Sequence, residues 1–129
     1  MSATNRIVRM AEGKRCVAVN EAAALIRDKW TILVLGALAR KQSLRYNELQ
    51  RAVTGISQRM LTLTLRSVEE NGLVERTVFP TTPPRVDYAL TPLGRTLVAP
   101  LKALLDWSME HRAAMAKARR AYAKARGAA

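Results

Sequence analysis

The chain has 129 residues and a formal net charge of +12. Its length is that of one domain, its 49% apolar content is that of a globular protein, and its single cysteine excludes an intrachain disulfide and favours a reducing compartment. The positive charge favours a polyanionic partner. Half of it lies in residues 112–129, which contain no acid, so the charge alone allows loose polyanion binding without indicating specific DNA recognition.

The two ends of the chain differ from its middle. Residues 1–15 are polar and basic, and we expect them to be flexible. They lack the apolar core of a signal peptide, and the longest apolar run, residues 32–39, is far shorter than the about 20 residues of a membrane span. We therefore expect a cytoplasmic protein without a membrane partner, with one domain over residues 16–111 and a basic, alanine-rich tail over residues 112–129.

Three short helices are predicted in the first half of the domain. The first covers residues 19–27, with Asn20 as its N-cap. The second covers residues 29–39, where apolar residues recur at steps of three and four. Residues 41–44 form a turn with room for one short strand, and the third helix covers residues 45–53.

The most informative segment is residues 55–76. Ser57 is a good N-cap for a helix, and Asn71-Gly72 is a good stop because glycine accepts the left-handed conformation at a helix end. Leu61, Leu65 and Val68 recur at helical spacing and predict a buried stripe. Two short helices joined by a tight turn that contains glycine form the helix-turn-helix pattern.

The opposite face of this fourth helix carries groups that can bind DNA. Its amide, hydroxyl and guanidinium groups can hydrogen-bond base edges and phosphates in a major groove, although a simple solvated face is the alternative for the helix taken alone. Gln58 and Arg59 are the best candidates for base reading, whereas Arg45 and Tyr46 are better placed for phosphates. The candidate DNA-binding residues are Arg45, Tyr46, Ser57, Gln58, Arg59, Thr62, Leu63, Arg66, Arg76 and Arg85.

A β-hairpin is predicted after this helix. Residues 73–79 have high strand propensity, and residues 86–90 alternate between apolar and other side chains, as in a half-buried strand. The loop between them contains three prolines, which reduce the entropy lost when it becomes ordered. A hairpin in this position is the wing of a winged helix.

Two arginines of the hairpin are candidates for contact with phosphates or a minor groove. Arg85 lies at its base and Arg76 on its first strand. Arg76 could instead pair with Glu75 or Asp87.

The last predicted helix begins at Thr91-Pro92, with threonine as N-cap and proline at the first helical position. Pro100 predicts a kink near Thr96. The helix is more apolar than one small domain can cover, which favours dimerisation over packing against the first helix. Beyond residue 110 it could be helical, frayed or an aid to sliding on DNA. The candidate dimer-interface residues are Leu25, Leu101, Leu104, Leu105 and Trp107.

Cys16 has two interpretations. It is a small buried apolar residue near a dimer interface, or a redox sensor whose thiolate is favoured by the adjacent Lys14 and Arg15. His111 is the only histidine, and one cysteine and one histidine so far apart do not make a metal site. Because the sequence has no phosphate-binding glycine loop, catalytic triad or acidic cluster, we predict no metal, no cofactor and no enzymatic activity.

The sequence as a whole resembles a known family, the HxlR-type winged helix-turn-helix transcription regulators, which are relatives of the MarR group. The resemblance spans about residues 16–111. It is carried by the order and spacing of DKWTILVL (28–35), LRYNELQRAVTGISQRMLTLTLR (44–66), ENGLVERTVFPTTPPRVDYALTPLGRTL (70–97) and LLDWSMEH (104–111).

The resemblance implies a homodimer that binds a palindromic operator and represses or activates nearby genes. The helix over residues 57–71 would enter the major groove, and the wing would lie along its flank. Dimerisation would use the first and last helices, and in some members the cysteine near the first helix senses electrophiles or oxidants.

The chain departs from the family pattern at two places. Leu63 and Thr64 stand where members often have polar residues, so Leu63 could contact thymine methyl groups or belong to the core. The basic tail after residue 112 is the second departure.

We therefore predict a mainly α fold with a small β-hairpin, a winged helix-turn-helix with flanking dimerisation helices. The predicted function is a sequence-specific dimeric DNA-binding regulator, with an effector that the sequence does not identify. The alternative is a non-specific nucleic-acid-binding or architectural protein driven by its tail, and a winged helix that binds protein is a third possibility.

Overall fold

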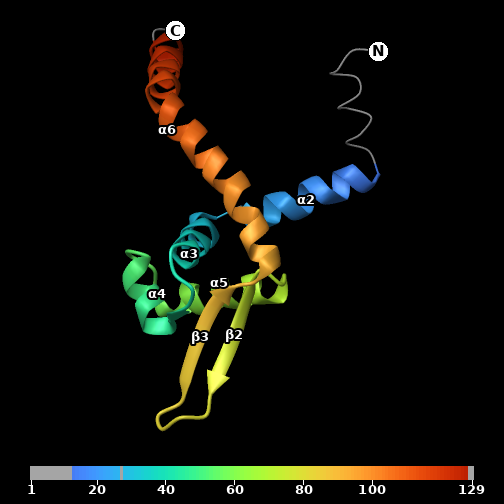
Figure 1. Ribbon diagram of the computed structural model, residues 1–129. Helices are drawn as coiled ribbons and strands as arrows, with labels where there is room; N and C mark the ends of the chain where they lie inside the picture. The colour runs from blue at the N-terminus through green and yellow to red at the C-terminus, as the bar shows by residue number, and fades with distance from the viewer. Residues whose placement is uncertain (1–12, 27, 128–129) are drawn as a thin grey trace.

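The computed structural model describes residues 13–26 and 28–127, so the prediction for residues 1–12 lies outside the described part. The chain is mainly α-helical with a small antiparallel sheet, which confirms the predicted winged helix-turn-helix class (Figure 1). In chain order the elements are α2 (Lys14–Ile26), α3 (Lys29–Ala39), β1 (Leu44–Arg45), α4 (Tyr46–Ala52), α5 (Gln58–Glu70), β2 (Val74–Phe79), β3 (Arg85–Leu90) and α6 (Pro92–Gly127).

The sheet has the order β1-β3-β2, and both pairings are antiparallel. β2 and β3 form the predicted hairpin, with Val74 opposite Leu90. The short strand for which the sequence left room lies at β1, where Leu44 pairs with Tyr88. This pairing joins the base of the wing to the start of α4.

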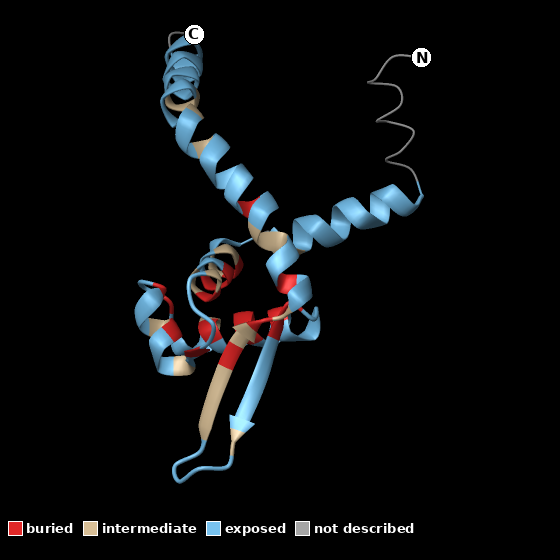
Figure 2. Cartoon of the chain, viewed as in Figure 1, coloured by how far each residue is buried: buried red, intermediate tan, exposed pale blue. Residues whose placement is uncertain are grey.

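The core lies where α3, α4 and α5 meet the upper end of the hairpin (Figure 2). Leu61 and Val68 of α5 are fully buried and Leu65 nearly so, which confirms the predicted stripe. Val34 and Leu38 of α3 join them in the same cluster. Each such side chain contributes about 1.5–3 kcal/mol on burial, so α5 is held firmly by its inner face.

Both ends of α5 are capped as the sequence predicts. The Ser57 hydroxyl accepts a hydrogen bond from the backbone N–H of Met60 at 3.1 Å. At the other end, the Asn71 side-chain amide donates to the Ser67 carbonyl at 2.8 Å, and Gly72 adopts φ = 75°. These caps fix where α5 begins and ends.

The start of α6 is attached closely to the segment that follows α5. Thr91 donates its backbone N–H to the Leu73 carbonyl at 3.0 Å and its hydroxyl to the Gly72 carbonyl at 2.6 Å. The same hydroxyl accepts from the N–H of Gly94 at 3.0 Å, so Thr91 is the predicted N-cap. A Cβ at position 94 would lie 2.0 Å from the Leu73 carbonyl oxygen, so only glycine fits there.

The predicted start of the first helix is wrong, whereas the helical alternative left open for residues after 110 is confirmed. α2 begins at Lys14, five residues before the predicted start, and Asn20 lies inside it rather than at its cap. α6 continues through Pro100 to Gly127 as one helix, so the domain boundary expected at residue 111 falls within it. Alanine has the highest helix propensity, and the alanine-rich sequence after residue 111 favours this continuation.

The candidate dimer-interface residues differ in exposure. Leu101 is 8% exposed and belongs to the core cluster, so its own chain already covers most of its side chain. Leu25 is partly buried against the core. Leu104, Leu105 and Trp107 are each about half exposed, so these three side chains are available to a partner.

Within the described residues, each helix is too short or too polar to cross a lipid bilayer.

Candidate nucleic-acid interface

The outer face of α5 is a row of exposed polar side chains. It carries Gln58, Arg59, Thr62, Arg66 and Glu69, all exposed and outside the buried stripe. Ser57, the cap, is also exposed. The helix is strongly amphipathic because its inner face is apolar and its outer face is polar, so burial of one face presents the other to a partner.

Leu63 is the exception on this outer surface. Its side chain is 46% exposed, whereas the adjacent Thr64 is buried. Of the two interpretations left open by the sequence, the core one does not hold for Leu63 within this chain. An apolar group therefore stands among hydrogen-bonding groups on the exposed side of α5.

Tyr46 fixes the angle between the two helices of the helix-turn-helix. Its hydroxyl donates to the Gln58 carbonyl at 2.8 Å and lies 3.0 Å from the Thr62 hydroxyl, which can donate to it in turn. The sequence predicted a phosphate contact for Tyr46. In the structure its hydroxyl is already bonded to α5, so it orients that helix.

A groove runs between α5 and the hairpin. Its volume is about 360 Å³, and it brings together Arg66 of α5 and Arg76 of β2, which the sequence placed on separate elements. Arg76 is exposed and makes no ion pair with another described residue. The groove is lined by Tyr46, Thr62, Leu65, Arg66, Glu69, Arg76 and Tyr88. Two guanidiniums at one opening can bind phosphate oxygens.

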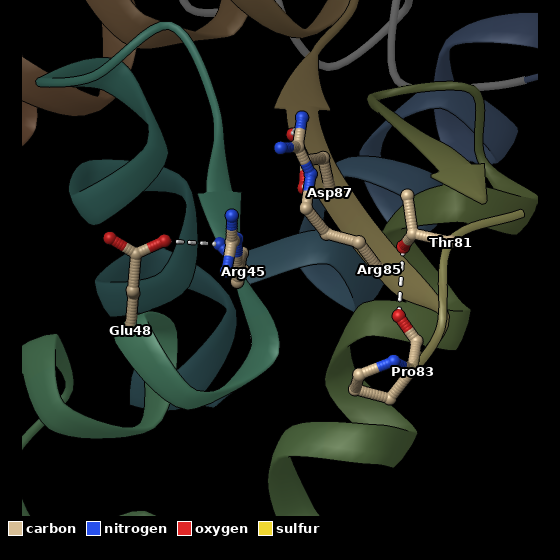
Figure 3. A network of polar contacts seen from close by, with 6 residues as sticks. All are labelled: Arg45, Glu48, Thr81, Pro83, Arg85 and Asp87. Atoms are coloured by element: carbon tan, nitrogen blue, oxygen red, sulfur yellow. Dashed lines mark hydrogen bonds and ion pairs between the residues drawn. The ribbon is translucent and has the colours of Figure 1, made fainter. Parts of the chain in front are cut away.

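Arg85 is held within the wing. Its Nε lies 3.2 Å from Asp87 Oδ1 and its Nη2 lies 3.3 Å from Asp87 Oδ2 (Figure 3). The guanidinium also lies over the Phe79 ring, 4.4 Å from its centroid. The sequence offered Asp87 as an alternative partner for Arg76, but this carboxylate pairs with Arg85. The charge of Arg85 is therefore partly neutralised before any DNA approaches.

Arg45 joins the helix-turn-helix to the wing. It is the last residue of β1, where it pairs in register with Asp87, and it is also the N-cap of α4. Its backbone N–H donates to the Glu48 carboxylate at 2.9 Å (Figure 3). The residue is exposed, and its guanidinium takes no part in this bond. Arg45 and Arg85 thus lie on neighbouring strands, but Arg85 pairs with Phe79 next to the loop, so its predicted place at the base of the hairpin is wrong.

A second groove, which the sequence did not reveal, lies between α3 and α6. It has a volume of about 330 Å³ and a mostly apolar lining. Gly36 and Gly94 open it because they have no side chains, and Leu35 and Leu105 form part of its walls. A glycine in a predicted helix was the available signal, but the sequence alone does not show which helix faces it.

The remaining candidate residues lie away from this interface. Cys16 is exposed in the first turn of α2, so its interpretation as a buried residue does not hold within the single chain. His111 stacks on Trp107 with ring centroids 4.7 Å apart. The Lys102 pKa is raised by its hydrogen bond to Asp106 on the exposed surface of α6. Among the described residues, no cluster of three or more histidine, cysteine or acidic side chains could hold a metal.

Comparison with known proteins agrees with this architecture. The family model described as HxlR-like helix-turn-helix matches residues 25–116. A curated relative from Methanothermobacter thermautotrophicus, described as an uncharacterized HTH-type transcriptional regulator, is 47% identical over 91 residues. This alignment covers 70% of the chain and 66% of the relative, just under two thirds of the relative's length.

Two solved structures are similar throughout most of their length. The redox regulator HypR in its reduced form has a TM-score of 0.72 and 34% identity, with 78% of this chain and 98% of HypR covered. A transcriptional regulator of the MarR family from Enterococcus faecalis has a TM-score of 0.68 and 39% identity, with 84% of this chain and 96% of that chain covered. With its winged fold, the exposed polar face of α5 and a family match over most of its length, the chain belongs to the HxlR-like helix-turn-helix family.

Proposed function

We propose that this protein is a dimeric transcriptional regulator that binds a specific palindromic DNA site in the cytoplasm and represses or activates nearby genes. The observation that carries the proposal is the exposed row of polar side chains on α5, flanked across the groove by Arg76 of the wing. Thr62 and Arg66 of α5 line the same groove as Arg76 of the wing, so hydrogen-bonding and positively charged groups from both elements are available to one duplex. The proposed role is that of a binding protein, not of an enzyme.

The proposed contacts follow from exposure and position. α5 enters the major groove with Gln58 and Arg59 at its N-terminal end, where recognition helices contact bases. Arg66 and Arg76 bind the phosphates beside the groove. Tyr46 acts indirectly because its hydroxyl is bonded to α5. Arg45 and the base of the wing contact the flanking backbone.

The proposed dimer is supported by surfaces that one chain leaves uncovered. None of the residues of α2 is buried, although the helix carries Val17, Val19 and Ile26. On α6, Leu104, Leu105 and Trp107 are about half exposed. A second copy that packs α2 and α6 against these helices would cover both surfaces. It would also give the two-fold symmetry that paired half-sites require.

The test is fluorescence-anisotropy binding to intergenic DNA beside the protein's own gene, with a shuffled duplex as control, at several salt concentrations. We expect a preference of about 10³-fold or more at physiological salt, with two chains per site. Arg59→Ala should lose that preference and keep non-specific binding, because a bidentate arginine contact discriminates by about 1–3 kcal/mol. Undiminished discrimination by Arg59→Ala would remove Arg59 from the base-reading set.

The alternative, an architectural protein driven by its tail, gives a different result in the same assay. It predicts equal binding to both duplexes with a steep salt dependence. Deletion of residues 113–129 would then abolish most binding, whereas the operator preference of a regulator would survive the deletion.

We also infer that the regulator responds to oxidants through Cys16. Two observations support this: the thiol is exposed on α2, a helix of the proposed dimer surface, and the similar HypR is described as a redox regulator. With one cysteine per chain, oxidation can give a sulfenic acid, a mixed disulfide or a bridge between subunits. Diamide should change the operator affinity of the wild type and leave Cys16→Ser unchanged. Equal responses of the two proteins would end this inference.

A further inference from the structure

The C-terminal part of α6 carries a concentration of positive charge that the proposed operator contact does not use. Residues 112–127 continue the helix and hold six basic side chains and no acid. All six are exposed, and none forms an ion pair with another described residue. They are Arg112, Lys117, Arg119, Arg120, Lys124 and Arg126.

Helical geometry arranges these charges in two rows. Arg112, Arg119 and Arg126 are seven residues apart, which places them almost in line along one side of the helix. Lys117, Arg120 and Lys124, at steps of three and four, form a second row beside it. The first row is about 21 Å long, a length over which a DNA duplex carries about twelve phosphate charges.

Local helix stabilisation explains only part of this charge. Lys124 and Arg126 lie in the last turn, where positive charge interacts favourably with the helix dipole. That effect falls off within one turn. Arg112, Lys117 and Arg119 are too far from the end to contribute in this way.

The proposed dimer leaves the second basic row exposed. Trp107 and Leu104 begin a series that continues at steps of three and four through His111, Ala114 and Ala118. At 100° per residue this series lies on a side of the helix away from both basic rows. Leu105 is seven residues before Arg112 and continues the line of the first row, but a second copy that packs on Trp107 and Leu104 leaves the row of Lys117, Arg120 and Lys124 uncovered.

The basic rows are also far from the operator. α6 starts beside α5 and runs away from the wing, so that its C-terminal end and the hairpin tip lie at opposite ends of the molecule (Figure 1). Arg112 follows the start of α6 by 20 residues, or about 30 Å of helix. If both recognition helices lie on one duplex, the two-fold axis is normal to that duplex. The two-fold rotation that relates the subunits leaves the distance of each atom from the DNA, measured along the axis, unchanged. The tail of the second subunit is therefore as far from the operator as that of the first.

We propose that residues 112–127 of α6 bind a second DNA duplex without sequence preference, so that an operator-bound dimer bridges two DNA segments. Two rows of like charge suit a regular polyanion. An acidic protein would need an apolar contact surface as well, and the positions between the rows, Ala116 and Ala123, offer little, while the exposed Tyr122 lies on the other side of the first row with the Arg126 guanidinium over its ring. The inference rests on the proposed function only for the first duplex.

A capture assay with the full-length protein tests the proposal. Dimer is bound to an immobilised operator duplex, unbound protein is washed away, and a fluorescent duplex of unrelated sequence is added. The test variant changes all six basic residues of the tail to Gln, which keeps helix propensity. The matched control changes the four arginines among them to Lys, which keeps the charge. Circular dichroism checks that both remain helical.

We expect the wild type and the Lys control to capture the second duplex, and the Gln variant to capture at least about tenfold less with unchanged operator preference. Capture should fall with salt with a slope of at most about 5, since each neutralised phosphate contributes about 0.9. The proposal would be overturned if the Gln variant captured as much of the second duplex as the wild type. It would also be overturned if the wild type bound the operator but captured no second duplex, or captured only poly-glutamate when that polyanion was offered instead. A wild type that shows no preference for the operator would count against the proposed function instead. The capture of a second duplex could still be measured in that case, with the protein bound to any immobilised duplex.

Discussion

Replacement of Gly94 by alanine should break the joint between α6 and the rest of the domain. The added Cβ would lie 2.0 Å from the Leu73 carbonyl oxygen and 3.0 Å from its carbon. Both atoms are backbone, so no flexible side chain can move aside. The peptide must move by roughly 1.5 Å to restore an ordinary contact distance.

That movement disturbs a hydrogen bond as well as the packing. The Leu73 carbonyl accepts from the Thr91 N–H at 3.0 Å, and loss of such a bond costs about 0.5–1.5 kcal/mol. Overpacking adds about 1–3 kcal/mol, while alanine gains up to ~1 kcal/mol over glycine in helix propensity. We expect a net loss of about 2 kcal/mol in the free energy of unfolding and a fall of roughly 10 °C in the melting temperature.

Gly36→Ala is the matched control. Gly36 lies in α3, and a Cβ there would meet no atom within 4 Å. The change should therefore raise stability by up to ~1 kcal/mol. Both variants should be melted by circular dichroism at one protein concentration, because the proposed dimerisation would make the melting temperature depend on concentration. If both melted within about 2 °C of the wild type, the inferred contact at Gly94 would be wrong.

Tyr46→Phe should lower the free energy of unfolding by about 1 kcal/mol in urea titrations, because the hydroxyl bonds to the Gln58 carbonyl and to Thr62 are lost, and an unchanged midpoint would contradict this. Leu63→Ala should make operator affinity insensitive to thymine methyl groups. Replacement of operator thymines by deoxyuridine should lower the affinity of the wild type at one position per half-site and leave that of the variant unchanged. Equal losses of affinity in the two proteins would exclude a methyl contact. Asp87→Asn should release Arg85 for a phosphate contact and steepen the salt dependence of DNA binding by about one contact, and an unchanged slope would show that Arg85 stays on Phe79.

The elements with strong local signals are the ones that could be predicted from the sequence. Ser57 and Gly72 bound α5 through caps that act over a few residues, and the stripe of Leu61, Leu65 and Val68 depends only on helical period. Helix type and limits follow in such places because local hydrogen bonds and burial favour the same structure.

The partners of individual side chains were harder to predict. The pairing of Arg85 with Asp87 rather than Arg76 with Asp87 depends on how the hairpin side chains meet Phe79. Leu101 has the same apolar pattern as Leu104, yet only Leu101 is buried by its own chain. A periodic pattern tells which face of a helix is apolar but not which neighbour covers it.

Because α6 is long and continuous, the distance between the two recognition helices of the proposed dimer depends on the angle at which the paired α6 helices pack. Its first turn is tied to the end of α5 through Thr91 and Gly94, so the recognition helix turns with it. A change of about 5° in the angle between paired α6 helices, acting over about 30 Å, displaces a recognition helix by roughly 3 Å. Half-sites bound by such dimers lie one helical turn of DNA apart, about 34–36 Å. A small repacking between the α6 helices would therefore move the recognition helices out of register with the half-sites.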